Sequence, residues 1–131
     1  MKIAIIVLFC LCLMPYLMVC ISGYYRKKQL GKIDNHLPRE QYTQLQGVGA
    51  RAVAAQQNAW EALILYSAAL LAVVASNLEV KYLAEAALIV LGARILHAIF
   101  YLADLDKLRT LSFLIAIAPC FYLFYVVLVI F

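Results

Sequence analysis

The chain has 131 residues, 67% of them hydrophobic, and a net charge of +4. Soluble domains are only about 45–50% apolar, so this composition excludes an ordinary water-soluble fold and indicates a chain that folds in lipid. The whole net charge lies in residues 24–51, where six basic side chains accompany two acidic ones. A short basic segment between apolar runs is typical of a membrane orientation signal, and we expect no nucleic-acid partner.

Residues 3–23 predict the first membrane helix, because they are almost all apolar and about 20 such residues suffice to cross a bilayer. A cleaved signal peptide is disfavoured, since no cleavage site with small residues follows the run. Residues 24–50 are polar and contain glycine and proline, which predicts a loop. The cysteines lie in apolar runs, so we expect free thiols and no metal site. They are Cys10, Cys12, Cys20 and Cys120.

Three further apolar segments predict helices over residues 51–76, 81–103 and 110–131. Four spans with short links predict an all-α fold, an antiparallel four-helix membrane bundle in one domain over residues 1–131. The loop at 24–50 and the polar connection at 104–109 must then lie on the same side. Their basic residues predict that both face the cytoplasm and that the two termini lie outside.

Two polar clusters interrupt the predicted second and third helices. The first is formed by Arg51, Asn58 and Glu61, and the second by Arg94, His97 and Tyr101. The spacing within each cluster places its members on one face of a helix. Ionisable side chains at bilayer depth are costly, and they usually have partners and a function. These six residues are therefore the candidates for a functional site.

The depth of Glu61 and Arg94 relates the two clusters. Glu61 lies ten residues after Arg51 and Arg94 lies ten residues before Asp104, which is about 15 Å in each case. We therefore expect an ion pair between the second and third predicted helices. Polar groups that only hold helices together explain the clusters equally well when these are considered alone. His97 by itself is a poor metal ligand, because no second histidine or cysteine lies nearby.

Convergence of charge at one end of the bundle favours a binding site over helix–helix contacts alone. Arg51, Arg94 and Arg109 are expected at the cytoplasmic end, together with Asn58 and Glu61. Guanidinium groups bind carboxylates in a fork geometry, so the set suits a polar ligand with carboxylates. The lipid-facing flanks would admit a hydrophobic small molecule, and an arginine beside a thiol would favour the thiolate.

The order of the motifs carries a family resemblance. The residues concerned are Leu37-Pro38-Arg39, Arg51-Ala52, Asn58-x-x-Glu61, Arg94-x-x-His97-x-x-x-Tyr101, Arg109 and Pro119-Cys120. With these motifs the chain resembles the MAPEG family, the membrane-associated proteins in eicosanoid and glutathione metabolism. The likeness covers nearly the whole chain. Bacterial members are similar in their motifs, which implies a bacterial inner membrane.

The resemblance implies a four-helix protomer that forms a homotrimer and binds glutathione between neighbouring protomers. Six residues correspond to positions that line or support that site: Arg51, Asn58, Glu61, Arg94, His97 and Tyr101. Arg109 corresponds to the arginine that favours the thiolate in catalytic members. Thr110 occupies the place of a serine proposed to act at the thiol in one branch.

Three positions depart from the family pattern. Ala54 and Phe113 replace an arginine and a tyrosine that contact glutathione in several members, and Gln56 replaces a histidine of one branch. Each lost charge-assisted hydrogen bond costs about 1.5–3 kcal/mol, so glutathione would bind less tightly. Eicosanoid synthesis is not favoured.

Two functions remain open. The first is a membrane-bound glutathione-dependent transferase or peroxidase that acts on hydrophobic electrophiles, with glutathione and membrane lipid as partners. The alternative is a non-catalytic scaffold of the same fold that binds lipid or peptide. A transporter is disfavoured, because four short spans without a repeat or a broken helix do not match transporter architecture.

Overall fold

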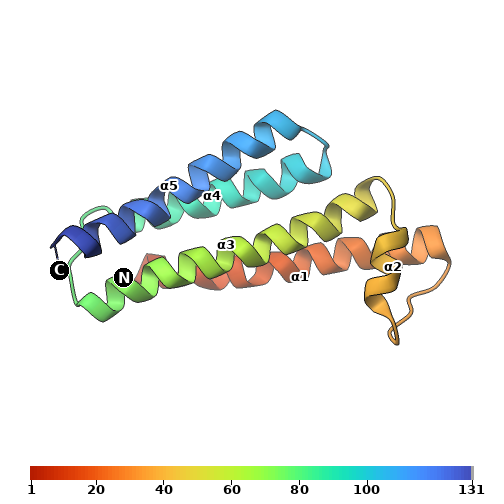
Figure 1. Ribbon diagram of the computed structural model, residues 1–131, viewed down its shortest axis with the longest axis horizontal. Helices are drawn as coiled ribbons and strands as arrows, with labels where there is room; N and C mark the ends of the chain where they lie inside the picture. The colour runs from red at the N-terminus through yellow and green to blue at the C-terminus, as the bar shows by residue number, and fades with distance from the viewer. Residues whose placement is uncertain (131) are drawn as a thin grey trace.

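The computed structural model describes residues 1–130, which are mostly helical and contain no strand. The helices are α1 (Lys2–Leu30), α2 (Pro38–Gln44), α3 (Val48–Ser76), α4 (Leu83–Leu102) and α5 (Asp106–Ile130). All except α2 are long and apolar enough to cross a membrane. Helices α1 and α3 lie side by side, as do α4 and α5, and the chain termini lie at the end opposite α2 (Figure 1). The predicted four-helix membrane bundle is confirmed.

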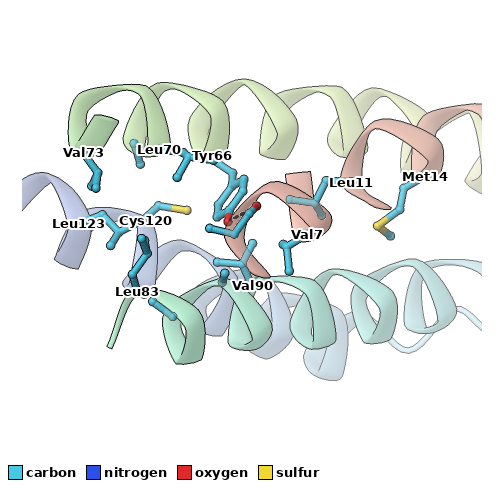
Figure 2. Packing of buried hydrophobic residues seen from close by; sticks show 14 of the residues in the cluster. Val7, Leu11, Met14, Tyr66, Leu70, Val73, Leu83, Val90, Cys120 and Leu123 are labelled. Carbon is cyan, nitrogen blue, oxygen red and sulfur yellow. Dashed lines mark hydrogen bonds between the residues drawn. The ribbon is translucent and has the colours of Figure 1, made fainter. Parts of the chain in front are cut away.

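The apolar core lies toward the end that carries the termini. Tyr66 of α3 is fully buried there, and its hydroxyl donates a hydrogen bond of 3.0 Å to the carbonyl of Ala4 in α1. Side chains from all four long helices surround it, and the sulfur of Cys120 points into the same cluster (Figure 2). The bond satisfies the phenolic hydroxyl, which would be costly to bury in an apolar core without a partner.

Small residues let α1 and α3 approach closely at the other end. A Cβ atom added to Gly49 would lie 2.9 Å from the Cβ of Tyr25, so a side chain there would force the two helices apart. Ala52, Ala55 and Ala59 continue the same buried face of α3. Close approach through small residues is how membrane helices gain van der Waals contact when lipid offers no hydrophobic driving force.

The helix bounds differ from the prediction where the chain leaves the apolar runs. Helix α1 continues to Leu30, α2 lies within the predicted loop, and α5 begins at Asp106 instead of residue 110. Hydropathy marks the limit of the lipid, whereas lysine and arginine are good helix formers that continue a helix into water. Helix α1 ends only at Gly31, which has a φ of 77° and caps it in the left-handed conformation.

Buried Arg26 holds the basic segment together through hydrogen bonds. Its Nε donates to Oε1 of Gln41 in α2 at 2.8 Å, and its Nη2 donates to the carbonyl of Asp34 at 2.6 Å. The Nε2 of Gln41 donates in turn to the carbonyl of Lys32 at 3.0 Å. From the sequence, Arg26 was expected only as one charge of the predicted orientation signal. In the fold its guanidinium also attaches α2 to the end of α1.

The connection between α4 and α5 is a tight helix cap. Asp104 has a left-handed φ of 63°, the N–H of Leu105 donates to the carbonyl of Phe100, and the N–H of Asp104 donates to that of Tyr101. This is the Schellman pattern with aspartate in the position where glycine is usual. The cap turns the chain within three residues, so the first turn of α5 lies beside the last turn of α4.

Candidate functional site

Asn58, Glu61 and Arg94 form one hydrogen-bonded chain across α3 and α4, which we call the cavity cluster. The Nη2 of Arg94 donates to Oδ1 of Asn58 at 2.8 Å and to its backbone carbonyl at 3.1 Å. The Nδ2 of Asn58 donates to Oε2 of Glu61 at 3.0 Å. Arg94 is only 2% exposed. The cluster therefore places a buried cation, an amide and a carboxylate in sequence.

The expected direct ion pair between Glu61 and Arg94 is wrong. Within residues 1–130 the pair that meets the distance for a salt bridge is Arg51 with Asp104. Asn58 lies one turn from Glu61 and carries both an acceptor and a donor, so its amide satisfies the guanidinium with one end and the carboxylate with the other. The guanidinium of Arg94 and the carboxylate of Glu61 are therefore connected by the hydrogen bonds of this amide.

Glu61 and Arg94 line one cavity of about 150 Å³ between α3, α4 and α5. Phe113 and Cys120 of α5 form part of its wall, and the remaining lining is apolar. Small-molecule sites usually enclose about 300–1,000 Å³. The cavity of one protomer is thus large enough for part of a ligand and too small for a whole tripeptide.

Two buried nitrogens lack a hydrogen-bond partner within the described chain. They are the Nε of Arg94 and the Nε2 of His97. A buried polar atom left unpaired costs about 1–3 kcal/mol, and such atoms often mark a place where water or a ligand binds. Arg94 therefore has an N–H donor, at Nε, beyond the Nη2 group that binds Asn58.

His97 attaches α4 to the first turn of α5. Its Nδ1 lies 3.1 Å from the carbonyl of Arg109, and its ring packs against Tyr101 with the centroids 5.5 Å apart. Because a carbonyl only accepts hydrogen bonds, Nδ1 must carry the proton, and Nε2 is then the acceptor of a neutral ring. The Oγ of Ser112 donates to the same carbonyl at 2.8 Å. His97 thus contacts the backbone that carries Arg109.

Three other candidates lie beyond His97, toward the α2 end, and we call Arg51, Tyr101 and Arg109 the rim cluster. The guanidinium of Arg109 lies over the ring of Tyr101, 4.5 Å from its centroid, and does not line the cavity. Arg51 donates from Nε to the carbonyl of Leu102 at 3.2 Å, and its Nη1 lies 3.3 Å from the carboxylate of Asp104. The rim cluster is joined to the cavity cluster through α4 and His97.

Thr110 uses its hydroxyl within its own helix. The Oγ1 donates to the carbonyl of Asp106 at 3.0 Å, and the residue is exposed. Such bonding to the preceding turn is common for threonine in helices. The oxygen keeps its lone pairs for a further partner.

Sequence reasoning missed two residues of this region. Cys120 belongs to the Pro119-Cys120 motif and was interpreted as a small apolar residue, but it was not expected to line a cavity. Ser112, which donates to the carbonyl of Arg109, was not among the candidates. The spacing of Phe113, Ala116 and Cys120 on one face of α5 is the signal that was available for the cavity wall. No group of three potential metal ligands occurs within residues 1–130.

A family model described as the MAPEG family matches residues 3–129. The chain belongs to the MAPEG family. The match covers nearly the whole sequence, and it confirms the resemblance carried by the motifs. Comparison with curated proteins gave no match, and comparison with solved structures gave none. Family membership and four helices able to span a membrane show an integral membrane protein. Members of this family generally use glutathione as a substrate or cofactor.

Proposed function

We propose that this MAPEG protein is a membrane-bound glutathione-dependent transferase or peroxidase that acts on hydrophobic electrophiles. The observation that carries the proposal is the cavity cluster, in which Asn58 joins buried Arg94 to the exposed carboxylate of Glu61 in an otherwise apolar part of the bundle. Glutathione carries carboxylates and an ammonium group, so a guanidinium and a carboxylate held at a fixed separation complement both of its charges.

The residues of the site match the charged groups of glutathione with both hydrogen-bond donors and acceptors. Arg94 has a buried Nε free for a carboxylate, and Glu61 offers a carboxylate oxygen for an ammonium group. In the proposed site Arg51 and Tyr101 hold the peptide at the rim, and His97 orients the turn that carries Arg109. Arg109 stabilises the thiolate, which is the nucleophile in thiol chemistry, and Thr110 assists at the thiol.

We further propose that the site is completed between protomers of a homotrimer. The cavity of about 150 Å³ in one protomer is smaller than a tripeptide requires, so a second wall must come from outside this chain. The exposed apolar faces of the helices leave room for such a neighbour and for lipid. The positive segment 24–51 favours a cytoplasmic location for this end of the bundle in a bacterial inner membrane.

The test is conjugation of glutathione to an aryl halide by the purified protein. Arg109→Ala should lower the rate about 10- to 100-fold, as expected when a charge-assisted contact worth about 1.5–3 kcal/mol is lost. Lys107→Ala is the matched control, because it removes a cation from the same exposed turn and should leave the rate unchanged. Equal rates for wild type and Arg109→Ala would remove Arg109 from the chemistry.

One observation favours the alternative, a non-catalytic scaffold that binds lipid or peptide. Arg51 and Thr110 are already hydrogen-bonded within the chain, to the α4–α5 connection and to α5 itself. If the protein in detergent releases no heat with millimolar glutathione, the scaffold is the better description. Saturable binding without turnover would also favour it.

A further inference from the structure

A second, larger pocket lies at the end of the bundle that carries the termini. It occupies about 570 Å³ between the start of α4 and the second half of α5. Its wall includes Tyr82, Glu85, Ile89, Ile115 and Tyr122. None of these residues belongs to the cavity cluster or the rim cluster, which lie nearer the α2 end. We call this pocket the outer groove.

Two tyrosines, Tyr82 and Tyr122, line the end of the outer groove nearest the termini, which we call its mouth. The hydroxyl of Tyr122 donates to the carbonyl of Lys81 at 2.7 Å, which joins α5 to the turn before α4. Tyr82 adopts a left-handed φ of 62°, uncommon for a residue with a large side chain. The ammonium of Lys81 lies 4.8 Å from the centroid of the Tyr82 ring. Tyrosines in such positions are typical of the membrane–water interface.

The charges at this mouth are of opposite sign. Glu85 is the one ionised residue of the lining, and Lys81, four residues earlier in the turn before α4, lies beside the lining residue Tyr82. Both are exposed, and within residues 1–130 they do not form an ion pair. Below the mouth, Ile89 and Ile115 give an apolar wall. Lys81, in the turn before α4, and Glu85, in the first turn of α4, therefore place opposite charges near one end of an otherwise apolar groove.

We propose that the outer groove binds a phospholipid whose headgroup carries a phosphate and a primary amine. Lys81 binds the phosphate, Glu85 accepts hydrogen bonds from the ammonium, and one acyl chain lies against Ile89 and Ile115. The charge pattern disfavours headgroups that lack a cation. A quaternary amine fits less well, because it has no N–H to donate to the carboxylate of Glu85.

The experiment is native mass spectrometry of the full-length protein in detergent with three phospholipids of identical acyl chains. Phosphatidylethanolamine should be retained about two- to fivefold over phosphatidylcholine and phosphatidylglycerol, the range expected from one solvent-accessible ion pair. Glu85→Gln should abolish the preference. Glu79→Gln is the matched control, because it removes an exposed carboxylate of the neighbouring turn that does not line the groove. Equal retention of the three lipids by wild type, or an unchanged preference in Glu85→Gln, overturns the proposal.

A second variant tests the apolar channel. Ile89→Trp fills the groove from an exposed position, so the protein should fold and retain less of every phospholipid. Unchanged retention would overturn the proposal, and so would a change in the number of protomers, since the groove would then be an interface between copies. Glutathione binding should be the same in both variants, which separates this site from the proposed active site.

Discussion

The two ends of the bundle are built differently. Near the termini, apolar side chains surround Tyr66, and its single hydrogen bond to Ala4 is local to that core. Toward α2, buried guanidinium groups bind polar partners: Arg26 donates to the side chain of Gln41, and Arg94 donates to the side chain of Asn58. Packing at one end of the bundle therefore supports an arrangement of charges at the other. Variants should therefore separate stability from glutathione binding.

The largest expected effect is on stability, at the apolar end. Tyr66→Ala removes a fully buried aromatic side chain, which should lower the free energy of unfolding by about 3–5 kcal/mol. Tyr66→Phe keeps the ring and loses the bond to Ala4, which should cost about 1 kcal/mol. Unfolding in detergent followed by circular dichroism measures both. Similar losses in the two variants would contradict a core held mainly by packing.

The next effect concerns binding, at the polar end. Asn58→Leu keeps similar volume and removes the amide between Arg94 and Glu61, which should weaken glutathione binding by about 10- to 100-fold. Calorimetry in detergent measures the affinity. Gln57→Leu is the matched control, because Gln57 is exposed on the same helix and does not line the cavity. This variant should bind glutathione as tightly as wild type does. Equal affinities for Asn58→Leu and wild type would remove the cavity cluster from the binding site.

A smaller effect is expected on the rate alone. His97→Phe keeps an aromatic ring beside Tyr101 and removes the donor to the carbonyl of Arg109. Loss of one neutral hydrogen bond of about 1 kcal/mol should lower kcat about fivefold and leave KM for glutathione nearly unchanged. Steady-state kinetics separates the two constants. A rise in KM with unchanged kcat would show His97 acting as a glutathione contact instead.

The smallest effect is expected at the rim. Asp104→Asn removes the ion pair with Arg51, whose partners are 25% and 69% exposed, so the stability loss should be at most about 1 kcal/mol. Denaturant unfolding at low and high salt measures it. The difference between the variant and wild type should shrink in salt, because exposed charges are screened. A loss that is large and independent of salt would contradict the comparison.

The sequence was sufficient for the membrane helices and the family, because apolar runs and ordered motifs are local properties. It could not predict that α1 continues to Leu30, since charge shows where lipid ends and not where a helix ends. Depth along the axis predicted that Glu61 and Arg94 lie at one level. Rotation about each helix axis decides which atoms meet. Because of this rotation, Asn58 lies between Glu61 and Arg94, and the guanidinium of Arg109 lies over the ring of Tyr101.

A structure of the protein with glutathione bound would show whether the cavity cluster binds it. We expect the carboxylate and ammonium groups of glutathione to contact Arg94 and Glu61, with its sulfur near Arg109. Glutathione bound at another surface, with Arg94 and Glu61 contacting no part of it, would contradict the account.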